Sequence, residues 1–417
     1  MTDLNFNGQN TLYATHGLHA YAAKCPPQLA RYAIEQYSRP GDTLIDPMVG
    51  SGTTLVEARL AGRNALGFDI DPLACLIAQA KCKDLPDDAI QAAYSAIIQK
   101  MEQVLQQGED VYPELPEFTN RDYWFSSTVS ASLAALSSAI QSIDISQDLR
   151  NFFWVAFSGI ILSKVSVANA RDIIHSRHHF FQHAAPPNVI MKFSERVRKM
   201  RNQMADFRIL CQQTAPTLSI VQQADARHLP LADQSIDLVF TSPPYATALD
   251  YPRAHFLAVG WMQSRLGLTV DQYKGHGATY IGSERGSVAK TFEPDEKLSS
   301  FPVALQTLVK LSQQDSRQAI LIQRYWLDMH AVFEQISRVL KPESHAVIVV
   351  CPSHIRKVEI PTHRLLTEIA QSYGLILKEE RTRTIDAGRR VLPYMQAAFG
   401  DRMSTEYVLV YQKEKKA

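Results

Sequence analysis

A strand–turn–helix–strand pattern in residues 44–71 constrains the fold of this chain more than any other feature. An apolar run ends at Asp46, a Gly-Ser-Gly turn follows, and a helical pattern begins at Thr53. A second apolar run ends at Asp69. Two strands joined by a helix run parallel in one sheet, because the helix returns the chain to the edge from which the first strand started. The segment therefore predicts one unit of an α/β fold.

The same alternation of strands and helices continues through most of the chain. Seven segments, most of them short and rich in β-branched residues, are bounded by polar residues, Gly or Pro, which is typical of strands. These strand candidates are 42–46, 64–69, 218–223, 236–241, 345–351, 375–384 and 405–411. The helical patterns are 53–61, 71–82, 320–340 and 361–373. The sequence predicts an α/β fold with a doubly wound, largely parallel sheet, in which ligands bind beyond the carboxyl ends of the strands.

One long stretch, between residues 84 and 216, interrupts this alternation. It is mostly compatible with helices, and its charges are segregated. Residues 84–150 contain 11 Asp and Glu against 3 Lys and Arg, whereas residues 164–208 contain 9 Lys and Arg against 3 Asp and Glu. Such a segment is either a solvated helical cap or a face that meets nucleic-acid phosphates, and charge alone favours neither interpretation.

The interruption also predicts how the chain divides. Residues 1–83 are expected to form the first part of the sheet domain, and residues 217–417 the second part. Residues 84–216 are expected to be a largely helical insertion and a candidate target-recognition region. Residues 267–318, which include "KGHGATYIGSERGS", are expected to be an irregular loop region.

Composition narrows the protein class. The chain has 417 residues and a net charge of +1, which is unlike a strongly basic nucleic-acid binder. Its five cysteines show no CxxC spacing, which predicts a reducing cytosol without disulfides or a zinc site. The N-terminus is polar, and no apolar run approaches the roughly 20 residues of a membrane span. Four histidines lack metal-ligand spacing, so no metal is predicted; they are His175, His178, His179 and His183.

The turn in residues 44–71 has the properties of a ligand-binding turn. Gly50 and Gly52 let the backbone approach a ligand closely, and Asp69 is placed to accept hydrogen bonds from ribose hydroxyls. No Gly-Lys-Ser/Thr follows, which excludes a P-loop, and the missing GxGxxG pattern makes NAD less suitable. A nucleoside-bearing ligand without a large phosphate group fits best. The alternative is an ordinary strand–helix turn without a ligand.

A second group of polar residues ends the third and fourth predicted strands. Asp225 follows the third strand, and the turn Ser242-Pro243-Pro244-Tyr245 follows the fourth. Both groups are therefore expected at the sheet edge where the first two strands end. Asp225 is placed to accept a hydrogen bond from an adenine amino group; the alternative is an aspartate that only caps a turn.

The Ser-Pro-Pro-Tyr turn suits an exocyclic amino group on a planar base. That nitrogen is a weak nucleophile, because its lone pair is delocalised into the ring. Ser242 Oγ and the carbonyl oxygen of Pro243 can accept its two N–H groups and aim the lone pair, while the prolines keep the backbone rigid. Tyr245 offers an aromatic face to the base. With an activated methyl donor, positioning supplies most of the rate and no strong base is required.

These motifs resemble those of the S-adenosylmethionine-dependent amino-methyltransferases. "DPMVGSGTT", "GFDID", "DAR" and "TSPPY" are similar to motifs I, II, III and IV of that family, and "THGLHAYAAKCPPQL" (15–29) is similar to motif X. The resemblance implies a seven-stranded Rossmann-like sheet and S-adenosyl-L-methionine as the cofactor. SPPY is typical of cytosine-N4 DNA methyltransferases, whereas DPPY is typical of adenine-N6 enzymes.

The resemblance implies methyl transfer to cytosine N4 in duplex DNA after base flipping. The alternatives are an adenine-N6 or RNA base methyltransferase and, from another class, a nucleic-acid-binding module without turnover. The implied cofactor-binding residues are Lys24, Asp46, Gly50, Gly52, Thr53, Asp69, Asp225 and Ala226. The implied residues around the flipped cytosine are Ser242, Pro243, Pro244 and Tyr245.

The sequence departs from the family pattern at three points. Met48 stands where Phe is usual, and the motif order X, I, IV is less common for enzymes with SPPY. No long segment follows the last predicted strand, so target recognition is expected from residues 84–216, from residues 252–318, or from both.

Arginines outside the motifs are the candidate nucleic-acid contacts. They are Arg171, Arg177, Arg198, Arg201, Arg389 and Arg390. Arg381 and Arg383, together with Arg389 and Arg390, form a second candidate phosphate contact. The alternatives are a solvent-exposed helix for the arginines in the insertion and an edge strand protected by charge for this second group. The resemblance implies double-stranded DNA as the partner, with or without a cognate restriction endonuclease, for a cytoplasmic, nucleoid-associated protein.

Overall fold

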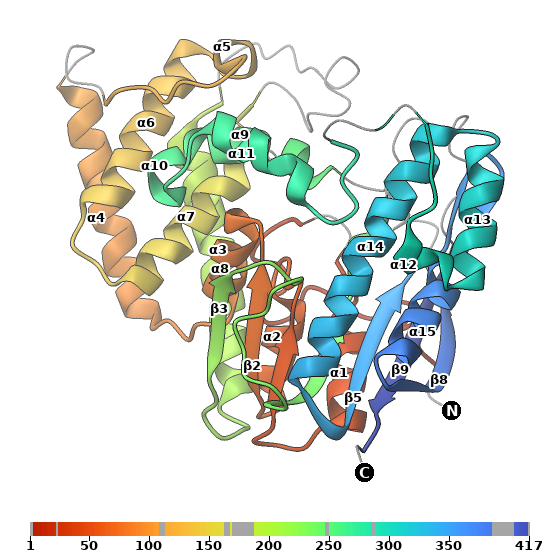
Figure 1. The fold of residues 1–417 in the computed structure, drawn as a ribbon. Helices are drawn as coiled ribbons and strands as arrows, with labels where there is room; N and C mark the ends of the chain where they lie inside the picture. Colours follow the sequence, from red (N-terminus) through yellow and green to blue (C-terminus); the bar gives the residue numbers. More distant parts are fainter. Residues whose placement is uncertain are drawn as a thin grey trace.

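A seven-stranded sheet forms the centre of the computed structural model (Figure 1). The structure describes residues 3–21, 24–107, 113–161, 167–168, 187–246, 250–285, 289, 291–385 and 404–415. The strands lie in the order β3-β2-β1-β4-β5-β9-β8. They are β1 (Thr43–Asp46), β2 (Asn64–Asp69), β3 (Ser219–Gln223), β4 (Ile236–Thr241), β5 (Leu340–Val350), β8 (Leu375–Thr384) and β9 (Thr405–Lys413).

All seven predicted strands are confirmed, and the sheet is mostly parallel. The four pairings between β3 and β5 along the order are parallel, whereas β9 runs antiparallel to both β5 and β8. The chain winds from β1 to one side through β2 and β3 and then crosses to β4. The strand order therefore reverses between β1 and β4, which is where doubly wound sheets form a crevice for ligands.

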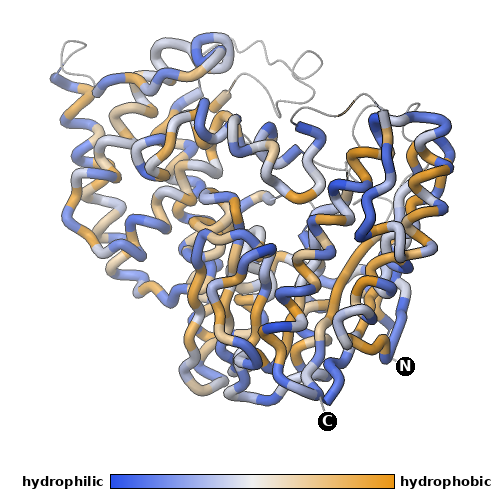
Figure 2. The backbone as a smooth tube through the Cα atoms, viewed as in Figure 1, coloured by the Kyte–Doolittle hydropathy of each residue, from blue (hydrophilic) through white to orange (hydrophobic). Residues whose placement is uncertain are grey.

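Helices cover both faces of the sheet, and Figure 2 shows hydrophobic residues along the central strands. Successive side chains of a strand point to opposite faces, so an apolar inner strand needs cover on both sides. Val347 and Val349 of β5 join one core, with the helices α1, α2 and α3, while Ala346 and Ile348 join the other core, with α13, α14 and α15. The bounds of these helices are α1 (Pro27–Tyr37), α2 (Thr53–Leu60), α3 (Pro72–Lys81), α13 (Pro302–Ser312), α14 (Ser316–Val339) and α15 (Thr362–Ser372).

The predicted insertion is helical in its described part, where no strand occurs. It packs beside α3 as a separate helical layer (Figure 1). Its core contains Phe152, Phe153 and Trp154, all without exposed surface. The helices are α4 (Asp87–Gln106), α5 (Arg121–Trp124), α6 (Ser127–Ser142), α7 (Gln147–Ile161) and α8 (Val189–Cys211).

The prediction of an irregular loop over residues 267–318 was wrong for much of that range. Helix α13 there buries Ala304, Leu308 and Leu311, which recur at helical spacing, and Pro302 occupies its first turn. Short helices separated by polar residues hid this pattern. The other elements after β4 are α9 (Tyr251–Trp261), α10 (Gln263–Leu266), α11 (Val270–His276), η2 (Gly277–Thr279), α12 (Glu296–Ser299) and the hairpin β6 (Ser353–Ile355) with β7 (Val358–Ile360). Among the described helices, none is both long and apolar enough to cross a bilayer.

Candidate active site

A cleft lies at the carboxyl ends of β1, β2 and β4, and encloses about 920 Å³, part of it open to solvent. Nine of the twelve residues that we predicted to bind the cofactor or the base line this cleft. They are Lys24, Asp46, Gly50, Thr53, Asp69, Asp225, Ala226, Ser242 and Pro244. Gly52, Pro243 and Tyr245 do not line it.

The glycine turn after β1 shapes the floor of the cleft. Gly50 has a φ of 48° and its N–H donates to Asp69 Oδ2 at 2.8 Å, so the turn is tied to the end of β2. Gly52 has a φ of 83°, and a Cβ there would lie 3.0 Å from Ala78 of α3. Gly52 therefore allows α2 to begin close against α3, and its role in the structure is packing.

Two carboxyl groups face the cleft from the ends of β1 and β2, that of Asp46 buried and that of Asp69 half-buried. Asp46 accepts hydrogen bonds from Thr54 Oγ1 at 2.5 Å and from the N–H of Met48 at 3.2 Å, and burial raises its pKa to about 6. Burial, and then the neighbouring charge of Asp71, raises the pKa of Asp69 to about 7. Buried acids with raised pKa values in a cleft are typical of functional sites.

Asp71 organises a hydrogen-bond network that sequence reasoning missed. It caps α3 through the N–H groups of Leu73 and Ala74, and it also accepts from Tyr273 Oη at 3.0 Å and contacts His255 Nδ1 at 2.9 Å. Burial would raise its pKa, but His255 and these hydrogen bonds hold the pKa of Asp71 below its ordinary value. The network ties α9 and α11 to the edge of the cleft.

Three tyrosines also line the cleft without having been predicted. The rings of Tyr21 and Tyr251 stack with centroids 5.8 Å apart, and Tyr21 packs over Gly50. Tyr280 follows η2. Tyr21 lies within the motif X segment and Tyr251 lies six residues after Tyr245, so proximity to a motif could have indicated both. No spacing pattern pointed to Tyr280.

Asp225 is held by an arginine. The guanidinium of Arg227 donates to both Asp225 oxygens, at 2.6 to 3.1 Å, and it also reaches Asp328 Oδ1 at 2.6 Å and the carbonyl oxygen of Thr279 at 2.9 Å. Burial opposes ionisation of Asp225, but the hydrogen bonds and charge of Arg227 lower its pKa. An ionised acceptor therefore faces the cleft from the end of β3.

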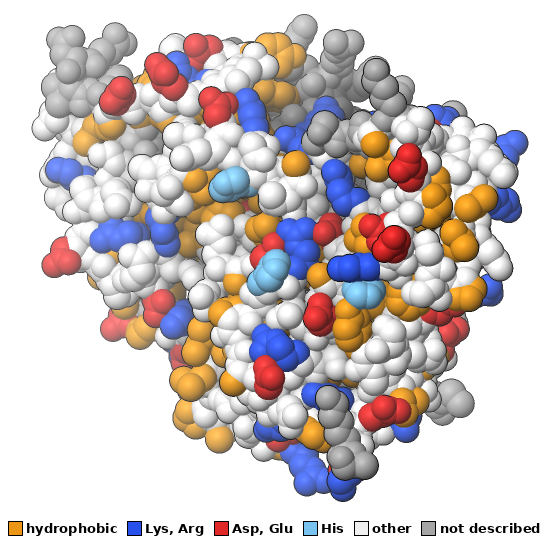
Figure 3. Space-filling view, viewed as in Figure 1, with side chains coloured by type: hydrophobic (Ala, Val, Ile, Leu, Met, Phe, Trp, Pro, Cys, Tyr) orange, Lys and Arg blue, Asp and Glu red, His pale blue; other side chains and the backbone are white. Residues whose placement is uncertain are grey.

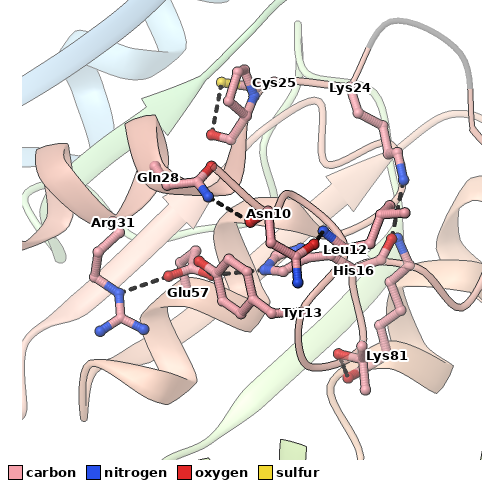
Figure 4. A network of polar contacts seen from close by, with 12 residues as sticks. Asn10, Leu12, Tyr13, His16, Lys24, Cys25, Gln28, Arg31, Glu57 and Lys81 are labelled. Atoms are coloured by element: carbon pink, nitrogen blue, oxygen red, sulfur yellow. Dashed lines mark hydrogen bonds and ion pairs between the residues drawn. The ribbon is translucent and has the colours of Figure 1, made fainter. Parts of the chain in front are cut away.

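The N-terminal segment is fixed to α2 by a buried carboxylate (Figure 4). Glu57, without exposed surface, contacts His16 Nε2 at 2.7 Å and accepts from Tyr13 Oη and Arg31 Nε, each at 2.6 Å. The same segment leads to Lys24, whose ammonium donates to the carbonyl oxygen of His16 at 3.0 Å. Burial lowers the pKa of Lys24 to about 8.

The Ser-Pro-Pro-Tyr turn follows β4 directly. Ser242 and Pro244 line the cleft, and the neighbouring Tyr245 is held by Glu406, to which its hydroxyl donates at 2.7 Å. Glu406 also forms an ion pair with Arg383. Arg383 is 8% exposed, so the interpretation of Arg383 as a phosphate contact or as a solvated charge on an edge strand was wrong.

The predicted arginine contacts to nucleic acid are only partly described. Arg198 of α8 is exposed, with no partner among the described residues. Arg201 forms an ion pair with Asp87 at 2.6 Å. Arg171, Arg177, Arg389 and Arg390 lie outside the described residues, as do the four histidines between 175 and 183. Within the described part of the chain, no three His, Cys, Asp or Glu side chains are grouped to hold a metal ion.

Comparison with known proteins finds similarity to DNA methyltransferases. A family model described as DNA methylase matches residues 4–80. The Type II methyltransferase M.MvaI of Kocuria varians is 28% identical over 399 residues, which cover 89% of this chain and 84% of that protein. The chain resembles the N4/N6-type DNA methyltransferases. This similarity supports an S-adenosylmethionine-dependent DNA methyltransferase and leaves cytosine N4 and adenine N6 as acceptors.

Other similarities to methyltransferases are more distant. The Type II methyltransferase M.BsoBI of Geobacillus stearothermophilus is 22% identical over 407 residues, covering 88% of this chain and 79% of that protein. A TehB-like SAM-dependent methyltransferase from Corynebacterium glutamicum aligns with 92% of this chain and 87% of its own, at 9% identity and a TM-score of 0.29. That structural overlap is too weak to bear on the fold.

Proposed function

We propose that the protein transfers the methyl group of S-adenosyl-L-methionine to the N4 amino group of a cytosine in double-stranded DNA, after the cytosine rotates out of the helix. One observation carries the proposal. Ser242 and Pro244 of the Ser-Pro-Pro-Tyr turn line the same cleft as Asp46 and Asp69 at the ends of β1 and β2. A methyl donor held by the aspartates would therefore lie next to an acceptor held by the turn.

The cleft residues fit this cofactor. Asp69 would accept the ribose hydroxyls, Asp225 the adenine amino group, and Lys24 would pair with the carboxylate of the methionine part. Gly50 lets the backbone approach closely, and Thr53 and Ala226 complete the walls. The bound cofactor supplies a methyl group already activated on a sulfonium, so the protein's contribution is orientation.

The turn after β4 would orient the acceptor. Ser242 Oγ and the carbonyl oxygen of Pro243 each accept one N–H of the cytosine amino group, which directs the nitrogen lone pair toward the methyl group. When bound, S-adenosyl-L-methionine would supply the methyl group to this nitrogen as its sulfur–carbon bond breaks, and the extra proton on the nitrogen would then be lost to water. Pro244 keeps the turn rigid, and the ring of Tyr245 would stack on the base.

Mass spectrometry of nucleosides from DNA incubated with the pure protein and cofactor tests this function. N4-methylcytosine is the expected product, and N6-methyladenine in its place would reassign the acceptor. Methylation of RNA in a parallel sample, with none in DNA, would change the substrate class. Ser242→Ala should lower turnover roughly 10²-fold, as expected for loss of a positioned hydrogen bond at the reacting group.

A matched control separates this effect from general damage. Ser235→Ala removes a hydroxyl just before the opposite end of β4, where Ser235 Oγ donates to the carbonyl oxygen of Ala232 and to no other group among the described residues. Turnover should be unchanged in this variant. Unchanged turnover in Ser242→Ala as well would refute the role of Ser242.

The biological setting is also part of the proposal. Relatives named Type II methyltransferases favour site-specific DNA methylation. We accordingly infer a nucleoid-associated, cytoplasmic enzyme with a cognate restriction endonuclease. Target recognition would come from the insertion of residues 84–216, from residues 252–318, or from both.

A further inference from the structure

A buried ion pair lies behind the last residue of the Ser-Pro-Pro-Tyr turn. Tyr245 Oη donates to Glu406 Oε1 at 2.7 Å, and Arg383 Nη1 donates to the other oxygen, Oε2. The side chains of Arg383 and Glu406 are only 7% and 12% exposed. Each carboxylate oxygen thus has its own partner, and the phenol is held at one end of a three-residue chain.

The topology explains how two C-terminal strands reach this edge of the sheet. Arg383 and Glu406 face each other in register, near the end of β8 and the start of β9. Because β9 runs antiparallel to β5, its first residues lie where the parallel strands end. Cys351, just after β5, donates to the carbonyl oxygen of Thr405 at 3.1 Å, which fixes the start of β9 there.

The pair is tied to the turn that lines the cleft, because Tyr245, which donates to Glu406, directly follows Pro244. Cys25 is one of the residues that line the cleft, and burial, followed by the charge of Glu406, raises the pKa of its thiol. Burial and then Glu406 also raise the pKa of Tyr245, so its phenol remains a donor. A carboxylate buried without a cation would be costly, and Arg383 offsets that cost.

We propose that Glu406 is a positioning residue for methyl transfer, held in turn by Arg383. By accepting the hydroxyl of Tyr245, Glu406 fixes the position of the ring on which the acceptor base stacks. The inference rests on the proposed function, in which Tyr245 contacts the base. Neither residue lies in a motif that indicates this role, and both act through Tyr245 alone.

Turnover and cofactor binding measured on the full chain test the proposal. Glu406→Ala should lower kcat on DNA roughly tenfold to 10²-fold, because a small displacement of a positioning group has effects of that size. The Kd for S-adenosylmethionine should stay within about twofold of wild type. Tyr245→Phe should lose a similar factor, and Glu406→Ala combined with Tyr245→Phe should lose no more than Tyr245→Phe alone. Glu406→Gln, which keeps an acceptor for the phenol, should recover part of the rate.

The chain offers a matched control. Tyr37 Oη donates to Glu379 Oε1 at 2.9 Å, so Glu379→Ala removes the same kind of bond from β8 away from the cleft. Its kcat should equal that of wild type. If Glu406→Ala does not fold, Tyr245→Phe still tests the bond, because the ion pair of Arg383 remains.

The outcomes separate the two proposals. Wild-type kcat in a folded Glu406→Ala or Tyr245→Phe protein overturns the positioning role while leaving the proposed function intact. Additive losses in the double variant, or an equal loss of cofactor affinity, assign Glu406 to stability and overturn it too. A wild-type protein that methylates no base refutes the proposed function and this inference with it.

Discussion

Asp69 and Asp71 are two residues apart, and their pKa values are shifted in opposite directions. Asp69 is surrounded by protein, and its pKa is raised to about 7 by burial and by the charge of Asp71. Asp71 itself stays ionised because His255, Tyr273 and two backbone amides compensate its charge. The network that orders α9 and α11 therefore also sets the titration of the carboxylate proposed to bind ribose.

We predict that cofactor binding strengthens as the pH rises from 5.5 to 7.5. The folded pKa of Asp69 lies above its ordinary value, so the protonated acid predominates at low pH and the carboxylate above about pH 7. The carboxylate accepts hydroxyl donors better than the acid. Calorimetric Kd values should show an inflection near pH 7, and the upper limit avoids titration of Lys24, whose pKa burial lowers to about 8.

Asp69→Asn should bind more weakly and lose this inflection. Asp225→Asn serves as the control, because Arg227 lowers the pKa of Asp225 and this residue does not titrate in the range. An inflection near pH 7 that persists in Asp69→Asn would contradict the assignment, whereas a residual inflection near pH 6 would belong to Asp46, whose pKa burial raises to about 6.

Lys81 gives a second prediction at the residue scale. Its side chain has no exposed surface and its ammonium nitrogen has no partner in the part of the chain that the structure describes. Burial lowers the pKa of Lys81 well below its ordinary value. Lys81→Met should raise the free energy of unfolding by about 1–3 kcal/mol at pH 7, since an unsatisfied buried polar group is removed.

The effect of Lys81→Met should depend on pH. Between the folded pKa and the ordinary value of about 10.4, the unfolded chain binds a proton that the folded chain does not, so wild-type stability rises with pH. Urea unfolding at pH 7 and pH 9.5 should show a smaller gain at the higher pH. Lys83→Met, which removes a half-exposed lysine paired with Asp148 at 3.4 Å, should change little at either pH. A gain for Lys81→Met that is absent or independent of pH would contradict this explanation.

At the scale of elements, the seven strands were predictable from the sequence, but the antiparallel direction of β9 was not. Each strand is a short apolar segment with polar boundaries. Asp46 and Asp69 end two of these strands and Ser242 follows a third, so order along the chain was enough to place these residues on one edge. Glu406 reaches that edge because β9 is antiparallel, which no local pattern encodes. Tyr280 lies within residues 267–318, which were expected to be an irregular loop but contain several helices.

Helix α2 anchors the N-terminal segment through one carboxylate, which predicts a combined loss of stability and binding. Glu57→Ala should lower the free energy of unfolding by about 3–5 kcal/mol, because His16 and Arg31 lose their shared buried partner. The segment that carries Tyr21 and Lys24 into the cleft should then be cleaved faster by protease, and cofactor affinity should fall.

Glu35→Ala is the control for Glu57→Ala. Glu35 pairs with the same Arg31 at 3.4 Å but is half exposed, so its loss should cost only about 0.3–0.5 kcal/mol. If Glu57→Ala unfolds no more easily than Glu35→Ala, the network of Glu57 does not anchor the segment.

At the scale of the whole molecule, charge is dispersed. The net charge is +1, and Figure 3 shows Lys and Arg side chains among Asp and Glu side chains on one face, without a continuous basic surface. Many surface cations are already paired within the chain, as Arg201 is with Asp87 and Arg208 with Asp84. DNA affinity would then depend on a few unpaired cations, since phosphate contacts supply most non-specific binding.

Two arginines on α8 test this idea, because they differ in pairing and share one helix. Arg198 is exposed without a described partner, whereas Arg201 donates to both oxygens of Asp87, at 2.6 and 2.9 Å. Arg198→Ala should weaken binding to any duplex and reduce the slope of log K against log salt by about 0.9, the value for one phosphate contact. Anisotropy titrations of a labelled duplex measure that slope. The salt concentration is varied between about 50 and 200 mM, the range in which phosphate contacts weaken.

Arg201→Ala should leave the slope unchanged and instead lower stability, because its charge is already neutralised inside the insertion. A reduced slope for Arg201→Ala would mean that its pair with Asp87 opens when DNA binds. Unchanged slopes in both variants would remove α8 from the phosphate-contacting surface. In that case, the segment from α9 to Tyr280, which shares Tyr251 and Tyr280 with the cleft, is the better candidate, because DNA bound there would place its flipped base beside Ser242.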